Sequence, residues 1–380
     1  MLEQKKTVKV RSSNIELLRI VAMYLIVIYH ITCHCIVVQL TDPASLGRTA
    51  VDTFNHPVFY TKLLSLNTIM SFGIIGNAIF ILISGYFMAN RDGSQINLGN
   101  IAKKLLLELG FSSCLLVCVP TILHRLYPGT YFNLQNITLF NNGSWFVGYY
   151  FAVVLCGALF LNRYLAKLDQ KKFAAFVLVL LALASFGWSG SLADALASGL
   201  RTFLTGLFLY SMGGYIKRFD PFKRVRLFTL LLVILGCYLI IWISSYNSDV
   251  TMIENYFRSG AQGTFFQNIP IFANHNIVIL ISSICIFEVF RRIHLPSSRL
   301  ITFLGKSTFM VYLMHDHYFF YELWNLKDWI TILATNPLSF LLQLLKCGAK
   351  TFAIGVLAYI LYELLAVIWK KISFLFIKRV

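Results

Sequence analysis

The chain has 380 residues, of which 58% are hydrophobic and only 13% are charged. Soluble domains carry about twice that charged fraction, so the composition excludes an ordinary soluble protein and indicates a polytopic membrane protein. The net charge of +17 does not indicate nucleic-acid binding, because the basic residues recur between apolar segments instead of gathering in one patch.

Apolar runs recur along the whole chain and predict an all-α fold with about ten transmembrane helices. The predicted spans are 17–38, 65–88, 102–123, 145–162, 173–189, 199–216, 226–246, 269–290, 300–321 and 351–370. With the N-terminus inside, the inner segments hold 23 Lys and Arg and the outer segments hold 8. This asymmetry predicts cytoplasmic N- and C-termini. Residues 1–13 and 373–380 are then basic cytoplasmic ends, and residues 14–372 form the membrane domain.

The first span carries Arg19 and His30 with ten residues between them. Eleven helical steps return to within about 20° of the same face and rise about 16 Å, so a cation near the inner end shares a face with a deeper imidazole. Ionisable side chains inside a membrane are costly and mark functional sites. Glu16 lies one turn before Arg19 and is placed to pair with it. His34 follows His30 by four residues, between two cysteines, but no further ligand set appears, so we expect no metal.

Three further features follow in chain order. Span two ends in Ser84-Gly85-Tyr86, which fits either a slot for a ligand close to the backbone or simple close helix packing. Trp145 opens span four, either in an aromatic belt or at a substrate. Span nine repeats the layout of span one, because Lys306 lies near its inner end and His315 lies about 13 Å deeper, beside Asp316.

These motifs together resemble the membrane-bound acyltransferase family 3, whose members are O-acyltransferases acting on cell-surface polysaccharides and related glycans. The matching segments are Glu16-Leu-Leu-Arg19 with His30, Phe80-Ile-Leu-Ile-Ser84-Gly85-Tyr86, Trp145-Phe-Val-Gly-Tyr-Tyr, and Val311-Tyr-Leu-Met-His315-Asp316. Two departures are visible: members commonly have Asp where Glu16 stands, and many have an arginine-rich stretch where this chain has Arg91 and the pair Lys103-Lys104.

The resemblance implies an enzyme of the plasma membrane that moves an acyl group, most simply acetyl, from cytoplasmic acyl-CoA to a glycan hydroxyl outside. Acyl-CoA is then a co-substrate, and no permanently bound cofactor is expected. We assign His30 as the general base, with Arg19, Glu16, His315 and Asp316 in the catalytic group. The donor site is assigned to Arg19, Ser84, Gly85, Tyr86, Lys103, Lys104 and Lys306, and the acceptor site to Trp145 and His34.

A second class of function stays open on the residues alone. A proton-coupled transporter or a flippase of a lipid-linked or small glycan also places His, Arg and Asp inside a helical bundle. The chain shows no paired broken helices and no half-repeat, which favours the enzyme. The oligomeric state and the identity of the glycan are not encoded in any of these motifs.

Overall fold

The computed structural model describes residues 12–41, 55–127, 144–186, 191–259 and 272–377, and within these ranges every regular element is helical. The elements are α1 (Ser13–Ile31), η1 (Thr32–Ile36), α2 (Val37–Thr41), α4 (His56–Met70), α5 (Phe72–Met88), η2 (Gly93–Gln95), α6 (Leu98–Leu126), α7 (Trp145–Cys156), η5 (Gly157–Leu161), α8 (Asn162–Ala166), α9 (Gln170–Ser185), α10 (Ser191–Phe219), α11 (Leu227–Ser259), α12 (Ile277–Arg292), α13 (Arg299–His315), α14 (Tyr318–Asn325), α15 (Trp329–Thr335) and α16 (Pro337–Ile377). The predicted all-α class is therefore confirmed for the described residues. Of the two predicted basic ends, residues 1–11 and 378–380 lie outside them.

Side-chain caps start many of these helices. In each case a side-chain oxygen accepts a hydrogen bond from a backbone N–H two or three residues later, as in the caps of α6, α9, α12, α13 and α15 by Asn97, Asp169, Asn276, Ser298 and Asp328. Such caps satisfy donors that the first helical turn leaves unpaired. The helix starts are thus fixed by local sequence as well as by hydrophobicity.

Six helical stretches among the described residues are long and apolar enough to cross a membrane. They are Ser13–Leu40, Tyr60–Met88, Leu98–Leu126, Trp145–Ala166, Leu227–Met252 and Pro337–Ile372. The remaining four predicted spans fall on α9, α10, α12 and α13, which do not meet the same criteria of length and composition. The chain is a multi-pass membrane protein, and the count of ten spans stays a prediction.

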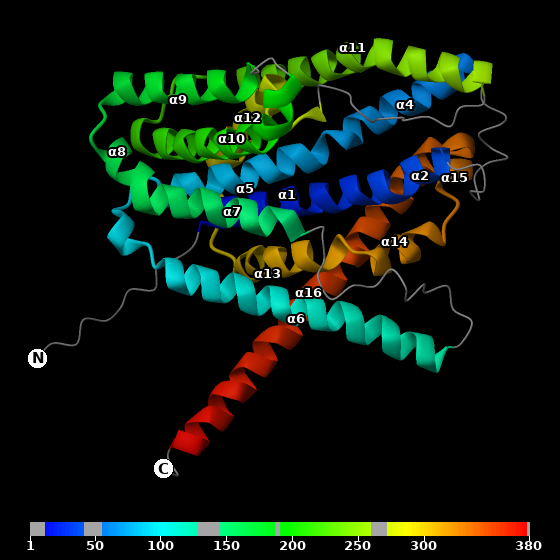
Figure 1. Cartoon of the computed structure of the whole chain (residues 1–380). Helices are drawn as coiled ribbons and strands as arrows, with labels where there is room; N and C mark the ends of the chain where they lie inside the picture. The colour runs from blue at the N-terminus through cyan, green and yellow to red at the C-terminus, as the bar shows by residue number, and fades with distance from the viewer. Residues whose placement is uncertain (1–11, 42–54, 128–143, 187–190, 260–271, 378–380) are drawn as a thin grey trace, which may run out of the picture.

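The N-terminal helix α1 lies inside the bundle. It packs against α5, α12, α13 and α16, while α5 packs against α10 on its other side. Helices α9 and α11 lie further out, against α10 and against α4 and α12 respectively. Figure 1 shows α6 along the edge beside α13, and α16 crossing the bundle obliquely with its C-terminal half extending away from it. Arg19 and His30 are therefore carried by a helix that is surrounded by protein.

Close approach of α5 and α10 depends on two glycines. A Cβ added at Gly85 would lie 2.0 Å from the carbonyl oxygen of Tyr210, and one added at Gly213 would lie 2.3 Å from that of Leu82. Only glycine leaves room for backbones at this separation. Gly85 thus serves helix packing, which is one of the two interpretations that the sequence left open.

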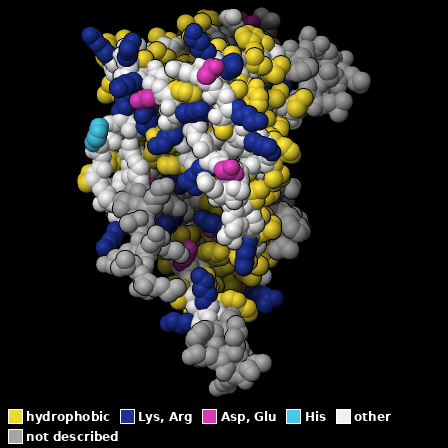
Figure 2. Space-filling view, turned by 90° about the vertical axis from the view of Figure 1, so that its left-hand side faces the viewer, with side chains coloured by type: hydrophobic (Ala, Val, Ile, Leu, Met, Phe, Trp, Pro, Cys, Tyr) yellow, Lys and Arg dark blue, Asp and Glu magenta, His cyan; other side chains and the backbone are white. Residues whose placement is uncertain are grey.

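Lys and Arg side chains gather on the face of the molecule seen at the left of Figure 1, which Figure 2 shows from the front. The turn at α8 and the start of α6 lie on this side. We call it the basic face. It corresponds to the side that charge asymmetry predicts to be cytoplasmic, and that orientation stays a prediction.

The opposite end of the bundle corrects the sequence analysis at two points. Span nine was expected to run through 300–321, but α13 ends at His315 and α14 begins at Tyr318. The segment 322–350, which separates the predicted spans 300–321 and 351–370, is largely helical, because α14, α15 and the first part of α16 occupy it. The break is stabilised locally, since the His317 ring accepts a hydrogen bond from the N–H of Phe319 and so caps α14.

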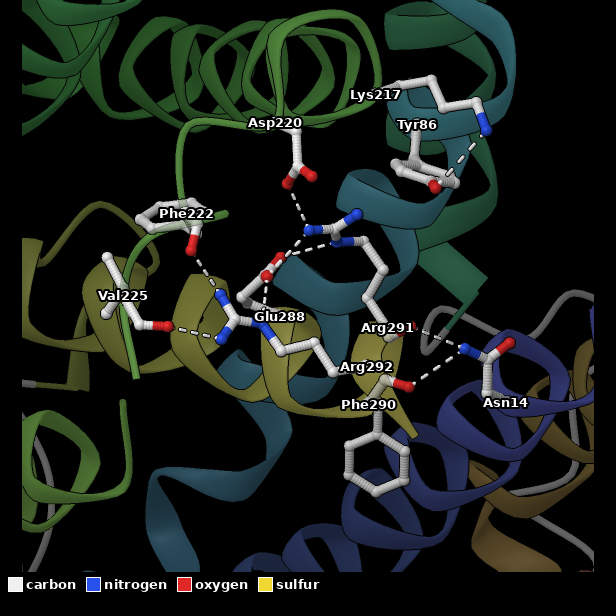
Figure 3. Close-up of polar contacts among 10 residues, drawn as sticks. All are labelled: Asn14, Tyr86, Lys217, Asp220, Phe222, Val225, Glu288, Phe290, Arg291 and Arg292. Carbon is white, nitrogen blue, oxygen red and sulfur yellow. Dashed lines mark hydrogen bonds and ion pairs between the residues drawn. The ribbon is translucent and has the colours of Figure 1, made fainter. Parts of the chain in front are cut away.

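A buried carboxylate joins α12 to the segment between α10 and α11 (Figure 3). Glu288 has no exposed side-chain surface, and its two oxygens accept hydrogen bonds from Arg291 Nε at 2.7 Å and from Arg292 Nε at 2.6 Å. The Arg292 guanidinium also donates to the carbonyls of Phe222 and Val225. One carboxylate therefore holds two arginines, and through them the turn that follows α10.

The same cluster reaches α1. The Asn14 side chain donates to the last carbonyls of α12, those of Phe290 and Arg291, at 3.1 and 2.9 Å (Figure 3). Arg291 also pairs with Asp220, which has the left-handed φ of 44°. The start of α1, two residues before Glu16, is thus anchored to α12.

Candidate active site

Arg19 and His30 lie on one uninterrupted helix, as predicted, because α1 runs from Ser13 to Ile31. Their separation of eleven residues corresponds to about 16 Å along the axis. Glu16 is 3% exposed and accepts a hydrogen bond from Arg19 at 3.1 Å between Oε1 and Nη1. The predicted pairing of these two side chains is present.

Gly305 on α13 provides the space that Glu16 occupies. A Cβ at this position would lie 2.2 Å from Glu16 Oε2. Any larger residue would therefore push the carboxylate away and with it the guanidinium of Arg19. Glycine at position 305, directly before Lys306, therefore leaves the space in which the Glu16 side chain lies.

A cavity of about 330 Å³ opens beside these residues. Its lining includes three cationic side chains, Arg19, Lys104 and Lys306, and the hydroxyl-bearing Ser84. The other lining residues are mainly apolar or aromatic: Ile26, Asn77, Phe80, Met88, Ile101, Leu105, Phe146, Tyr150, Gly305, Thr308, Phe309 and Tyr312. The cavity therefore joins a basic end to an apolar interior, which suits a ligand with an anionic head and a neutral arm.

The apolar end of the cavity lies one helical turn from two histidines. Ile26 precedes His30 by four residues on α1, and the Tyr312 ring lies 5.9 Å from the His315 ring. His30 Nδ1 and His315 Nε2 are 2.7 Å apart, and the planes of the two rings differ by 22°. Helices α1 and α13 thus bring together the two imidazoles that the sequence placed in separate spans.

The hydrogen bonds fix which nitrogen of each imidazole carries the proton. His315 Nδ1 faces the carbonyl oxygens of Val311 and Tyr312 at 3.0 and 2.9 Å, and carbonyls only accept, so we assign the proton of neutral His315 to Nδ1. His315 Nε2 is then an acceptor, and His30 Nδ1 donates to it. In neutral His30 the lone pair is therefore on Nε2, where a general base needs it.

Asp316 completes this cluster just after the end of α13. Its Oδ1 atom lies 3.9 Å from His30 Nδ1 and 3.5 Å from His34 Nε2, and the Tyr321 hydroxyl donates to it. The residue has non-helical φ and ψ of −89° and 67°. The break after His315 is thus what turns this carboxylate toward α1, where its charge stabilises an imidazolium at His30.

The π-helical turn η1 directly follows α1 and contains His34. Such turns are rare in proteins as a whole, and those that occur are frequently at functional sites. The His34 ring stacks on Tyr321 with centroids 4.1 Å apart, and its side chain is 34% exposed. His34 therefore lies at the accessible edge of the cluster, while His30 and His315 lie inside.

His30, His34 and Asp316 also form a group whose donor atoms lie within 4.8 Å of one another, close enough to hold a metal ion. The expectation of no metal rested on the lack of a third ligand near His30 and His34, and the structure supplies that ligand. A cation that used His30 Nδ1, which lies 3.9 Å from Asp316 Oδ1, would displace the proton that this nitrogen donates to His315. We therefore interpret the group as a proton-handling site.

Several predicted site residues lie away from the cavity. Gly85 packs against α10. The ring of Tyr86 lies under the ammonium of Lys217 at 4.7 Å (Figure 3), whereas Ser84 lines the cavity. Lys103 precedes Lys104 but does not line the cavity. Trp145 is 47% exposed and reaches the site only through its neighbour Phe146, whose ring it contacts. Its assignment to the acceptor stays a prediction.

The structure adds residues that the sequence analysis missed, namely Asn77, Phe146, Thr308 and Tyr312 in the cavity and Tyr321 beside Asp316. Phe146 donates its N–H to the Tyr312 hydroxyl at 3.3 Å, which joins α7 to α13. Asn77 had a visible signal, because it is a lone amide inside a strongly apolar span. The aromatic residues had none, since aromatics are common throughout the chain.

Comparison with known proteins identifies the family. A family model described as an acyltransferase domain, that of acyltransferase family 3, matches residues 12–367. Neither the curated proteins nor the solved structures that were compared gave a match. The match spans all the helices that build the cavity and the histidine cluster. This chain therefore belongs to the acyltransferase 3 family and is a membrane acyltransferase.

Proposed function

We propose that this protein transfers an acyl group, most simply acetyl, from cytoplasmic acyl-CoA to a hydroxyl of an exported or cell-surface glycan. The observation that carries the proposal is the cavity, which runs from Arg19, Lys104 and Lys306 to within one turn of the paired histidines. Acyl-CoA has the matching polarity, because its phosphates lie at one end of a long neutral arm and its thioester at the other. The cavity is smaller than a whole acyl-CoA, so the nucleotide stays at the basic end.

His30 Nε2 is the atom that takes the proton. The acceptor hydroxyl attacks the thioester carbonyl, a C–O bond forms, and the proton passes to His30 Nε2. The C–S bond then breaks, and the CoA thiolate leaves and takes a proton from the imidazolium. His315 keeps Nε2 free by accepting from Nδ1, and Asp316 offsets the charge that develops on the ring.

The acceptor enters from the side opposite the basic face. His34 supports this, since its side chain is partly exposed at the edge of the cluster and stacked on Tyr321. Stacked aromatic and imidazole rings with a nearby carboxylate suit a sugar, which presents both apolar faces and hydroxyls. With the basic face in the cytoplasm of a plasma-membrane protein, the two substrates meet at His30 from opposite sides.

The proposal is tested with purified protein in liposomes, labelled acetyl-CoA and a crude cell-surface glycan extract. We expect label to move to the glycan fraction and free CoA to be released only when the extract is present. Empty liposomes and a heat-inactivated sample control for spontaneous hydrolysis. Failure of label to move with any extract would count against acyl transfer, and uptake of a glycan by the same liposomes would then favour the transporter alternative.

Lys306→Gln is expected to raise KM for acetyl-CoA by about 10-fold. A charged hydrogen bond to phosphate contributes about 1.5–3 kcal/mol. We expect the lower end of this range because Lys306 is exposed at the open end of the cavity. The increase in KM should be clearly smaller with acetyl-pantetheine, which has no phosphates. Steady-state kinetics with both donors measures this. Equal increases in KM with the two donors would mean that the phosphates do not bind at Lys306.

A further inference from the structure

Asn77 lies in the wall of the cavity on α5, in a helix that is otherwise almost entirely apolar. Its Oδ1 atom is buried and has no hydrogen-bond partner among the described residues. Asn77 therefore brings an amide with two donors and an acceptor into the cavity wall without pairing its oxygen.

An unpaired buried polar atom costs about 1–3 kcal/mol, and most such atoms in native proteins find a partner. Leucine would fill the same position in this helix without that cost. A polar residue at a buried position that favours an apolar one is expected at functional sites. The amide also rotates easily about its last torsion, so either its oxygen or its nitrogen can turn to a ligand.

The depth of Asn77 identifies the part of the ligand that it meets. A Cβ at the preceding Gly76 would lie 2.5 Å from the side chain of Ile26, so Asn77 is level with Ile26 on α1. Ile26 is four residues, or about 6 Å, before His30. Ser84, near the basic end, is seven residues or about 10 Å away along α5. Asn77 thus lies between the phosphate-binding end and the reacting end, nearer the latter.

We infer that the Asn77 side chain hydrogen-bonds the secondary amide nearest the thioester of the acyl donor. This inference rests on the proposed function. In an acyl-CoA, two methylenes join that amide to the sulfur of the thioester. In an extended arm, the distance from the amide to the thioester carbonyl is therefore about one helical turn. With the thioester carbonyl at His30, the amide falls at the level of Ile26 and Asn77. Asn77 is then a binding residue that sets how far the arm enters.

Two short donors isolate this contact, because neither has phosphates. S-acetyl-N-acetylcysteamine keeps the amide, whereas S-pentyl thioacetate has the same chain length and no amide. We expect the wild type to prefer the amide donor, and Asn77→Leu to reduce kcat/KM for that donor by about 10-fold or more while changing the alkyl donor little. The donor preference, measured as a ratio, is independent of the amount of active protein.

Controls separate this role from a structural one. Asn77→Leu should unfold at the same temperature as the wild type or higher, because it removes an unpaired buried oxygen. Thr205→Val changes a buried polar residue outside the cavity lining, whose hydroxyl donates to the carbonyl of Arg201, and should leave the donor ratio unchanged. Asn77→Ala repeats the test if leucine is too large.

The outcomes are distinct. A wild type that transfers acetyl groups and a donor ratio that falls in both Asn77 variants support the inference. Wild-type activity with an unchanged ratio in Asn77→Leu and Asn77→Ala overturns it and leaves the proposed function standing. A wild type that uses neither acetyl-CoA nor any short thioester overturns both.

Discussion

Replacement of His30 by alanine is expected to lower the rate of acyl transfer by about 10²–10⁴-fold, the range that a positioned general base supplies. His30 has the geometry for the role, because its Nδ1 is held by His315 and its Nε2 keeps a lone pair. The cations to which we assign donor binding line the cavity about three turns away, so KM for acetyl-CoA should change far less than kcat. Release of CoA from acetyl-CoA in the presence of glycan extract measures both constants.

Two further variants decide whether His315 acts through His30. His315→Ala should slow transfer less than His30→Ala, and the double variant should be no slower than His30→Ala alone, because a positioning residue has nothing left to position. His294→Ala is the matched control, since this histidine is exposed in the segment after α12. If the losses in rate of the two single variants multiply in the double variant, His315 has a role independent of His30. If His30→Ala keeps full activity, His30 is not the general base.

Glu288→Gln is expected to destabilise the protein by an amount near the lower end of about 3–5 kcal/mol, the usual cost of breaking a buried ion pair. The carboxylate is fully buried, whereas Arg291 and Arg292 are 21% and 24% exposed and can recover part of their solvation. The loss also releases the turn after α10, whose carbonyls Arg292 holds. Equilibrium unfolding in detergent, followed by tryptophan fluorescence, measures the change.

The matched control is Glu363→Gln, the same chemical change at an exposed position of α16, which should shift stability by less than about 0.5 kcal/mol. Double-mutant cycles with Arg292→Gln should show a strong coupling free energy with Glu288→Gln and none with Glu363→Gln. If Glu288→Gln and Glu363→Gln have equal effects, the cluster in Figure 3 contributes no more to stability than a surface residue.

The sequence predicted those features that depend on helical periodicity and hydrophobicity. Arg19 and His30 share one helix, and His315 lies at the same depth from the basic end as His30, because a regular rise per residue fixes depth. The Arg19–Glu16 pair followed from one-turn spacing. Such predictions hold where a helix is straight and uninterrupted.

Features that depend on departures from the regular helix were not predictable. Nothing in residues 32–36 distinguishes the π-turn η1 from an ordinary helix, and the break after His315 contains neither glycine nor proline. Both are fixed by tertiary contacts, such as the stacking of His34 on Tyr321 and the bond from Tyr321 to Asp316. These contacts join residues that the sequence placed in a span and in a loop.

The segment Ser84-Gly85-Tyr86 shows a third limit. Its three residues face different neighbours, since Ser84 lines the cavity, Gly85 contacts α10, and Tyr86 contacts Lys217 and Phe287. A helix turns by 100° per residue, so adjacent positions never share a face. A motif of consecutive helical residues therefore cannot act as one binding slot, and only its serine lines the cavity that we propose binds the donor.

The most direct test of the central claim is a structure of the protein with a ketone analogue of acetyl-CoA, in which a methylene separates the carbonyl from sulfur and prevents transfer. The account predicts the phosphates beside Arg19, Lys104 and Lys306, the arm in the cavity past Asn77, and the carbonyl next to His30, with space for an acceptor hydroxyl within about 3–3.5 Å of the carbonyl carbon. An analogue bound outside this cavity, or one whose carbonyl lies far from His30, would contradict it.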